Sequence, residues 1–174
     1  METLGDLLRE RADINRRLRQ FPIFRTKGNH LVPLSEEIVA RMVGGTRGSE
    51  GQPGWDVIAP DGVTIQVKAG AISSPEEYRT FGGARPGRVA DWYAFMALDD
   101  SLTRVWWLFM IPAHEVPGIT TGKQHATDSR RIRTHPLRID RTADAQSALD
   151  RLLALEAGRP TDSPAGPAAG TAGS

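Results

Sequence analysis

The chain has 174 residues, of which 39% are hydrophobic and 25% charged, and its formal net charge is +1. This length and composition indicate one soluble domain with a sizeable core. No stretch approaches the roughly 18 apolar residues of a membrane span, so no membrane partner is expected. Cysteine is absent, which excludes disulfides and thiolate zinc sites. Any nucleic-acid binding must use local basic patches, because a net charge of +1 is weak for such proteins.

Residues 1–20 are the first predicted unit, with an amphipathic helix over residues 3–20. The apolar side of this helix consists of Leu4, Leu7, Leu8, Ile14 and Leu18. We expect this side to pack on the core or on a partner subunit. The arginines Arg16, Arg17 and Arg19 either contact phosphate groups or form a solvated face, which is the commoner case. Acids and arginines are interleaved here without the apolar core of a signal peptide, so we expect a cytoplasmic protein.

A second helix is predicted over residues 34–43, where apolar residues recur at helical spacing before Gly44. At about 100° per residue, Glu36 falls on the rim of the apolar arc and Glu37 falls toward water. A carboxylate on the rim can reach a site beside the sheet, so we select Glu36 as a candidate site residue. The alternative is a pair of acids that favours the helix N-terminus through its dipole, an interpretation that suits Glu37 at least as well.

A tight β-hairpin is predicted over residues 55–68. Its loop, residues 60–62, has the sequence Pro-Asp-Gly of a type I turn closed by a glycine bulge. In that register Val57 pairs with Ile65, and polar and apolar side chains separate. One face carries Trp55, Val57, Ala59, Val63, Ile65 and Val67, and the other carries Asp56, Ile58, Thr64, Gln66 and Lys68. A two-residue loop would mix these sets, so their segregation selects the three-residue loop.

The polar face of this hairpin has the residue types of a metal site. Directly opposed residues lie roughly 5 Å apart, so Asp56 and the Gln66 amide oxygen can reach one hard cation such as Mg²⁺. The Val67 backbone carbonyl is a third candidate ligand. Lys68 lies next along the same face, where its ammonium can orient a water or stabilise charge on a phosphate. The alternative is a surface hairpin whose outer face is merely polar.

A loop-rich segment follows the hairpin. Residues 74–78 have the cap and proline of a short helix, and residues 81–88 are rich in glycine and arginine. Because this loop emerges just beyond Lys68, Arg85 and Arg88 are candidates for phosphate contact, with an ordinary surface connection as the alternative.

Residues 91–98 and 104–111 predict a second hairpin that completes the sheet. We expect its aromatic residues to lie in the core, although a stacking platform for bases is the alternative. These residues are Trp92, Phe95, Trp106, Trp107 and Phe109. Residues 112–116 predict a short turn of helix.

The most basic segment is residues 130–140, whose alternation predicts a late strand at a sheet edge. Its arginines Arg130, Arg131 and Arg133 are the best candidates for phosphate contact. Residues 142–157 predict a final helix. Residues 158–174 contain no aromatic or large aliphatic side chain, which predicts a disordered tail.

The order of these features resembles the PD-(D/E)xK nuclease superfamily, which has the restriction-endonuclease-like fold. Its signature is an acid on one strand and an acid-x-Lys triplet on the next. Here Asp56 matches the first part, and residues 66–68, Gln-Val-Lys, match the second. Residues 54–57 and 65–68 look like the "GYD…QVK" form of small bacterial members, and residues 35–40 resemble the helix that often adds a glutamate. The resemblance covers roughly residues 30–112.

Two positions depart from the family pattern. Gln66 stands where the family most often has Glu or Asp, so the site loses one negative charge and its metal affinity should fall. Trp55 replaces the proline that usually precedes the first acid, at a position that is commonly variable.

The resemblance implies an α/β domain over residues 21–157, with a central mixed sheet flanked by helices. It implies hydrolysis of a phosphodiester, with DNA as the expected substrate, by a water activated at one or two Mg²⁺ or Mn²⁺ ions. Asp56 and Gln66 would be ligands, Glu36 would assist a ligand water or a second metal, and Lys68 would position the nucleophile. It also implies a homodimer, or a subunit of a larger defence or repair complex.

Two other functions stay open from the sequence. The Gln66 site could bind metal too weakly to cut, which would leave a nuclease-fold subunit that binds DNA or acts as a scaffold. A pure interaction protein, which recruits a partner through its N-terminal helix, is the third hypothesis.

Overall fold

The computed structural model describes residues 3–24, 29–49, 54–82, 90–121 and 126–155. Its centre is a six-stranded mixed sheet whose strands lie in the order β1 (Thr46–Arg47), β2 (Val57–Ile58), β3 (Thr64–Ala71), β5 (Trp92–Leu98), β6 (Val105–Pro112) and β9 (Ile139–Asp140). β3 and β5 are parallel, and the other neighbours are antiparallel. A small antiparallel sheet has the order β4 (Thr80–Phe81), β8 (Ala126–Asp128) and β7 (Thr120–Thr121).

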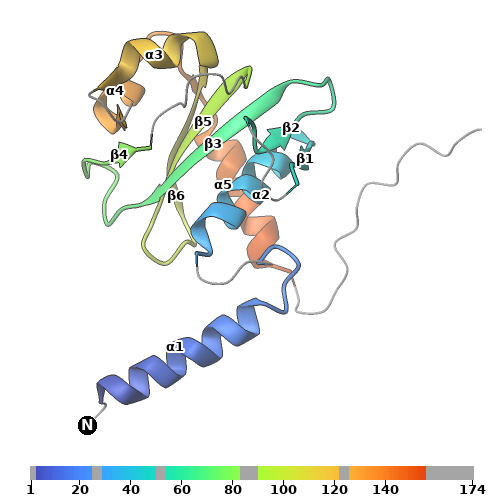
Figure 1. Cartoon of the computed structure of the whole chain (residues 1–174), viewed down its shortest axis with the longest axis vertical. Helices are drawn as coiled ribbons and strands as arrows, with labels where there is room; N and C mark the ends of the chain where they lie inside the picture. The colour runs from blue at the N-terminus through green and yellow to red at the C-terminus, as the bar shows by residue number, and fades with distance from the viewer. Residues whose placement is uncertain (1–2, 25–28, 50–53, 83–89, 122–125, 156–174) are drawn as a thin grey trace, which may run out of the picture.

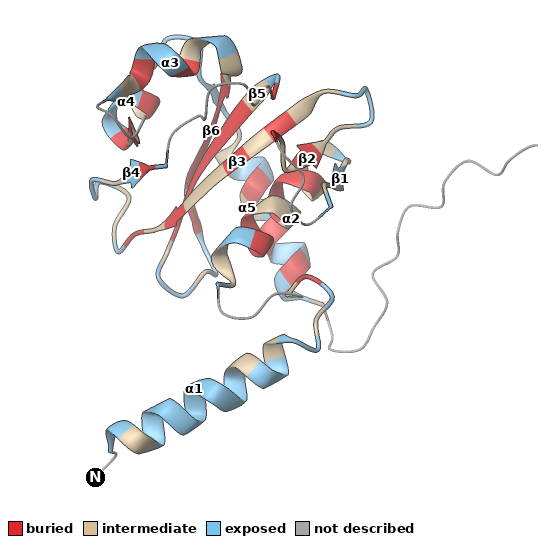
Figure 2. Cartoon of the chain, viewed as in Figure 1, coloured by how far each residue is buried: buried red, intermediate tan, exposed pale blue. Residues whose placement is uncertain are grey.

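Helices and the small sheet cover the two faces of the central sheet. α2 (Leu31–Val43) and α5 (Thr142–Leu153) pack against one face, and the 3₁₀ turn η1 (Ala113–Glu115), α3 (Val116–Ile119) and α4 (Ser129–Thr134) lie on the other side with β4 (Figure 1). Successive side chains of β5 point to opposite faces of the sheet and so contribute to a hydrophobic core on each face. Met96 lies in the core beneath α2 and α5, and Phe95 lies in the second core, on the opposite face. The chain is therefore a mixed α/β protein with a mixed sheet flanked by helices, and the buried residues follow the central strands (Figure 2).

The first hairpin has the register that the segregation of its side chains predicted. Val57 pairs with Ile65, and the Ala59 N–H donates to the Val63 carbonyl at 2.8 Å. Gly62 has φ of +86°, in the left-handed region that closes the loop. A local turn signal and a two-sided pattern were together enough to determine this pairing.

α1 (Leu4–Leu18) is a helix, as expected, but it does not pack on the core. Thr3 and Asp6 form a capping box at its start. None of its residues is buried, and Leu4 is 72% exposed. Figure 1 shows the helix pointing away from the sheet. Its apolar side is therefore available to another molecule.

The second hairpin is confirmed: β5 and β6 are antiparallel, with Phe95 opposite Phe109. Phe95, Trp107 and Phe109 are buried in the second core, whereas Trp92 and Trp106 are half-buried. The expected turn of helix after this hairpin is present as η1, and α5 confirms the final helix. The tail over residues 158–174 lies outside the described part of the chain.

Two predicted elements are wrong. Residues 74–78 form a bend and a turn followed by irregular backbone, not a short helix. Residues 130–134 belong to α4, because the Asp128 side chain accepts the Arg130 N–H at 2.7 Å and caps a helix that buries Ile132. Within residues 130–140 the structure has one strand, β9, and it does lie at the sheet edge, beside β6.

No helix in the described ranges combines the length and the apolar character of a membrane span.

Candidate functional site

Asp56 lies immediately before β2, and its backbone forms hydrogen bonds on both sides. Its N–H donates to the Ile65 carbonyl at 2.9 Å, and its carbonyl accepts the Gly48 N–H at 2.7 Å. Strand pairing with β3 ends at Val57, so Asp56 stands where β2 leaves β3 and is not a ladder partner of Gln66. The carboxylate is thereby fixed beside a free stretch of the β3 backbone.

The Asp56 side chain forms hydrogen bonds with this stretch of β3. Its Oδ2 accepts the backbone N–H of Val67 at 2.7 Å and also contacts the Gln66 amide nitrogen. Gln66 and Lys68 project from the same face of β3 because they are two residues apart. The positive charge of Lys68 acts on Asp56, since it lowers the pKa of that carboxyl. The structure thus brings together the three residues that the sequence selected, and we call them the Asp56 cluster.

The neighbours of the Asp56 carboxylate offset only part of the cost of burying its negative charge. Burial raises its pKa above the usual value, although the Val67 N–H, the Lys68 charge, the Gln66 amide and Arg47 all act to lower it. A further cation next to Asp56 would offset this cost of burial, because opposite charge favours the ionised form.

Glu36 is joined to the Asp56 cluster through Arg47. Its Oε2 accepts from Nη2 of Arg47 at 2.8 Å and from Nε at 3.3 Å. The same guanidinium lowers the pKa of Asp56, so Arg47 links the two carboxylates electrostatically. Sequence reasoning missed Arg47, because a single arginine in the two-residue strand β1 gives no local signal of its neighbours.

The prediction that Glu37 faces water is wrong. Its side chain is 20% exposed, against 19% for Glu36, and it accepts from Arg41 Nε at 2.9 Å. α2 begins at Leu31 rather than Leu34, so both acids lie beyond the first turn. An interpretation based on the helix dipole therefore fails for Glu37.

Tyr93 lies on β5, beside the Asp56 cluster. It pairs with Gln66 in the parallel register of β3 and β5 and is only 3% exposed. Burial raises the pKa of its hydroxyl, with a smaller contribution from the charge of Asp56. The sequence placed Tyr93 on a strand but gave no sign that this strand lies next to β3.

The cluster offers oxygen ligands of the kind that Mg²⁺ or Mn²⁺ takes. The N–H and C=O of one strand residue point to the same side, so the Val67 carbonyl faces the Asp56 side of β3 and not β5. The Gln66 amide places its nitrogen on Asp56, and a turn about its last bond would present the oxygen instead. Asp56, Val67 and Gln66 therefore fit a hard cation completed by water.

Among these candidate metal ligands, only Asp56 carries a negative charge. The described ranges contain no group of three or more His, Cys, Asp and Glu side chains placed to hold a metal. A cation here would depend on Asp56, on neutral oxygens and on water, and its affinity should be correspondingly low.

The basic candidates lie on α4, on the side of the sheet that Gln66 and Lys68 face. The Arg130 guanidinium lies over the Tyr78 ring, 5.4 Å from its centroid, and Arg133 Nη1 donates to the Pro75 carbonyl at 2.9 Å. Arg130 and Arg131 are exposed. Arg85 and Arg88 lie outside the described residues.

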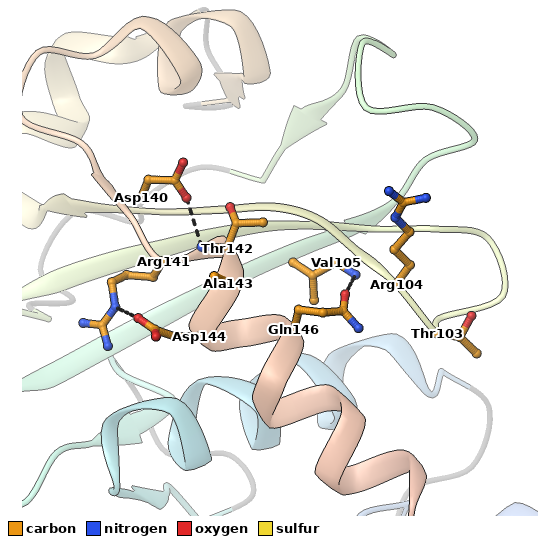
Figure 3. A pocket seen from close by; sticks show the side chains of 9 residues that line it. All are labelled: Thr103, Arg104, Val105, Asp140, Arg141, Thr142, Ala143, Asp144 and Gln146. Atoms are coloured by element: carbon orange, nitrogen blue, oxygen red, sulfur yellow. Dashed lines mark hydrogen bonds and ion pairs between the residues drawn. The ribbon is translucent and has the colours of Figure 1, made fainter.

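A separate cavity of about 740 Å³ lies between the start of β6 and the start of α5 (Figure 3). Its charged residues have local partners: Arg141 Nε binds Asp144 at 2.5 Å, Asp140 accepts the Thr142 N–H at 2.9 Å, and the Arg104 guanidinium lies over the Trp106 ring. The Gln146 amide oxygen accepts the Val105 N–H at 2.7 Å. None of the Asp56 cluster lines this cavity, and its polar groups are accounted for by local structure.

No protein-family model matches the chain, and no curated protein matches it significantly. Function must therefore be inferred from the site itself.

Proposed function

We propose that the protein is a metal-dependent nuclease with a restriction-endonuclease-like fold, which hydrolyses phosphodiester bonds in DNA. This proposal rests on the Asp56 cluster, in which a partly buried carboxylate, an amide and an ammonium group lie close together where β2 leaves β3. A carboxylate with raised pKa beside a lysine suits a site that takes a divalent cation and a phosphate together.

The arrangement of elements supports the same family. α2 precedes an antiparallel pair of strands, with the acid immediately before β2 and the Gln-x-Lys triplet on β3, inside a mixed sheet covered by helices. This is the order that the PD-(D/E)xK resemblance implies, and Glu36 comes from the helix that the resemblance selects.

Each residue of the cluster has a defined task in this proposal. Asp56, the Val67 carbonyl and the Gln66 amide oxygen would hold Mg²⁺ or Mn²⁺, which when bound lowers the pKa of a water and polarises the phosphate. Lys68 would orient the attacking water and stabilise charge on the phosphate. Glu36 would assist from the rim, with Arg47 as the group that fixes its carboxylate.

The direct test is incubation of the purified chain with linear, supercoiled, single-stranded and branched DNA, with and without Mg²⁺ or Mn²⁺. We expect cleavage of at least one form that chelation of the metal abolishes. Absence of metal-dependent cleavage on every form would refute the nuclease proposal.

One observation favours a second candidate, a nuclease-fold subunit that binds DNA without cutting it. Gln66 is neutral and turns its amide nitrogen toward Asp56, so a cation must compete with an existing contact. Calorimetry with Mg²⁺ and Mn²⁺ separates the two. A cutting site should bind one ion at about millimolar concentration or better, and a scaffold should bind neither.

Partners of the chain are part of the same proposal. The exposed apolar side of α1 suits a second copy or another subunit of a defence or repair complex. A chain that binds no nucleic acid even at low salt would instead be a pure interaction protein.

A further inference from the structure

Arg79 lies across β3 next to the Asp56 cluster. A Cβ built on Gly70 would overlap the Nε, Cδ and Cζ atoms of Arg79, so this side chain occupies the space directly above Gly70. Gly70 follows Gln66 and Lys68 on the same face of the strand, and neighbours on one face are about 7 Å apart along it. The Arg79 guanidinium therefore continues the row of polar groups on β3.

Arg79 is held in place from both sides. Its N–H donates to the Ser129 hydroxyl at 3.1 Å, and its carbonyl accepts the Ser129 N–H at 2.9 Å. Its Nη1 donates to the Ala71 carbonyl at 2.8 Å. Within the described ranges, that bond uses one of the five N–H donors that a guanidinium offers. As far as the described residues show, the other donors are left for an anion that lies along β3.

The same connection links β3 to the basic helix α4. Arg130 lies over Tyr78, and Arg133 binds the Pro75 carbonyl, so α4 packs on the segment that carries Arg79. Two of the acids nearby accept backbone N–H groups: Asp128 caps the Arg130 N–H, and Glu77 accepts the Ser73 N–H at 2.6 Å. Arg79, Arg130 and Arg133 form what we call the Arg79 row.

We propose that the Arg79 row binds the sugar-phosphate backbone of the strand whose phosphodiester reaches the Asp56 cluster. The proposal rests on the nuclease function for its substrate. It assigns Arg79 as the positioning residue nearest to Lys68. It also assigns Gly70 as the position that must lack a side chain. Arginine suits this role because its planar donors match two phosphate oxygens at once.

A purely structural Arg79, which only ties β4 to β3, is the competing explanation. The two explanations differ in salt dependence. A residue that contacts phosphate adds to the slope of log affinity against log salt by roughly one, whereas a residue that only shapes the fold leaves that slope unchanged.

The test measures binding of fluorescent single-stranded and duplex DNA by anisotropy, with the full chain and with EDTA in place of divalent metal. We expect Arg79→Ala to weaken binding several-fold and to reduce the salt slope by roughly one. Arg151→Ala is the matched control, because Arg151 is exposed on α5, against the other face of the sheet. It should leave both quantities unchanged.

Two further variants keep the test decisive if Arg79→Ala folds poorly. Gly70→Ala retains the charge but displaces the guanidinium, and Arg130→Ala removes an exposed charge of the row; each should lower the salt slope. Slopes of all three variants equal to that of Arg151→Ala would overturn the proposal. This binding assay contains no metal and does not depend on cleavage. A chain that binds through the Arg79 row here, but shows no cleavage in the separate assay with Mg²⁺ or Mn²⁺, would refute only the nuclease function.

Discussion

The Asp56 carboxylate accepts the backbone N–H of Val67 at 2.7 Å across the point where β2 leaves β3. This bond fixes the one carboxylate of the Asp56 cluster against the backbone of a strand. It also orients the Val67 carbonyl to the same side. The free edge of β3 is thus the framework on which the proposed metal site depends.

Replacement of Gln66 by glutamate should strengthen metal binding. Gln66→Glu adds a negative charge beside Asp56, and we expect Mg²⁺ to bind about tenfold more tightly, equivalent to roughly 1.4 kcal/mol. Without metal, the two carboxylates should repel each other and lower the thermal stability. Calorimetry and thermal unfolding measure both effects. The same change at exposed Gln20 should do neither, and an unchanged Mg²⁺ affinity in Gln66→Glu would exclude position 66 from the metal site.

Asp56 should make the metal-free protein less stable as the pH rises. Because burial raises its pKa in the folded state above the usual 3.8, the folded chain binds this proton more readily than the unfolded chain. The stability that Asp56 contributes is present below its usual pKa and is lost as the pH rises through its folded-state pKa. Asp56→Asn does not ionise, so its free energy of unfolding relative to wild type should be higher at pH 7 than at pH 3.

Urea unfolding at both pH values, with EDTA present, checks this prediction. Asp150→Asn, which removes an exposed carboxylate on α5, is the control. If wild type instead gained stability relative to Asp56→Asn between pH 3 and pH 7, the pKa of Asp56 would have to be lowered by folding, contrary to the structure.

Gly62 should be required for its backbone conformation alone. A Cβ at this position would meet no atom within 4 Å, but φ is +86°. We expect Gly62→Ala to lower the free energy of unfolding by about 1–2 kcal/mol through backbone strain. Gly118→Ala is matched, because that position also has open space but lies in α3, where alanine is favoured. Equal stability of the two variants would show that the left-handed conformation of Gly62 does not disfavour alanine.

The sequence predicted those features that local chemistry determines. Residues 60–62 specify the turn, and alternation around Val57 and Ile65 specifies the register, so the amino-acid pattern alone was enough to group Asp56, Gln66 and Lys68. α4 was misjudged because Arg130 and Ile132 alternate as in a strand, while the capping bond from Asp128 outweighs that pattern. One apolar residue between arginines fits either element.

Contacts between distant segments were beyond sequence reasoning. Arg47 reaches Glu36 only because β1 adds to the sheet beside α2. Tyr93 lies beside Gln66 only because β3 and β5 are parallel neighbours. Arg79 reaches Gly70 through a connection whose path depends on α4. No periodicity in a single chain encodes such pairings, since they follow from how the faces of separate elements pack together.

Metal-dependent cleavage by wild type, Asp56→Ala and Lys68→Ala, measured on the same DNA under the same conditions, is the decisive test of the proposed nuclease site. We expect each substitution to lower the cleavage rate at least about 100-fold, as is typical when one group that stabilises charge in the transition state is removed. Thermal unfolding should show that both variants remain folded. Full activity in Lys68→Ala, or cleavage by Asp56→Ala at the wild-type rate, would show that the Asp56 cluster is not the site of cleavage.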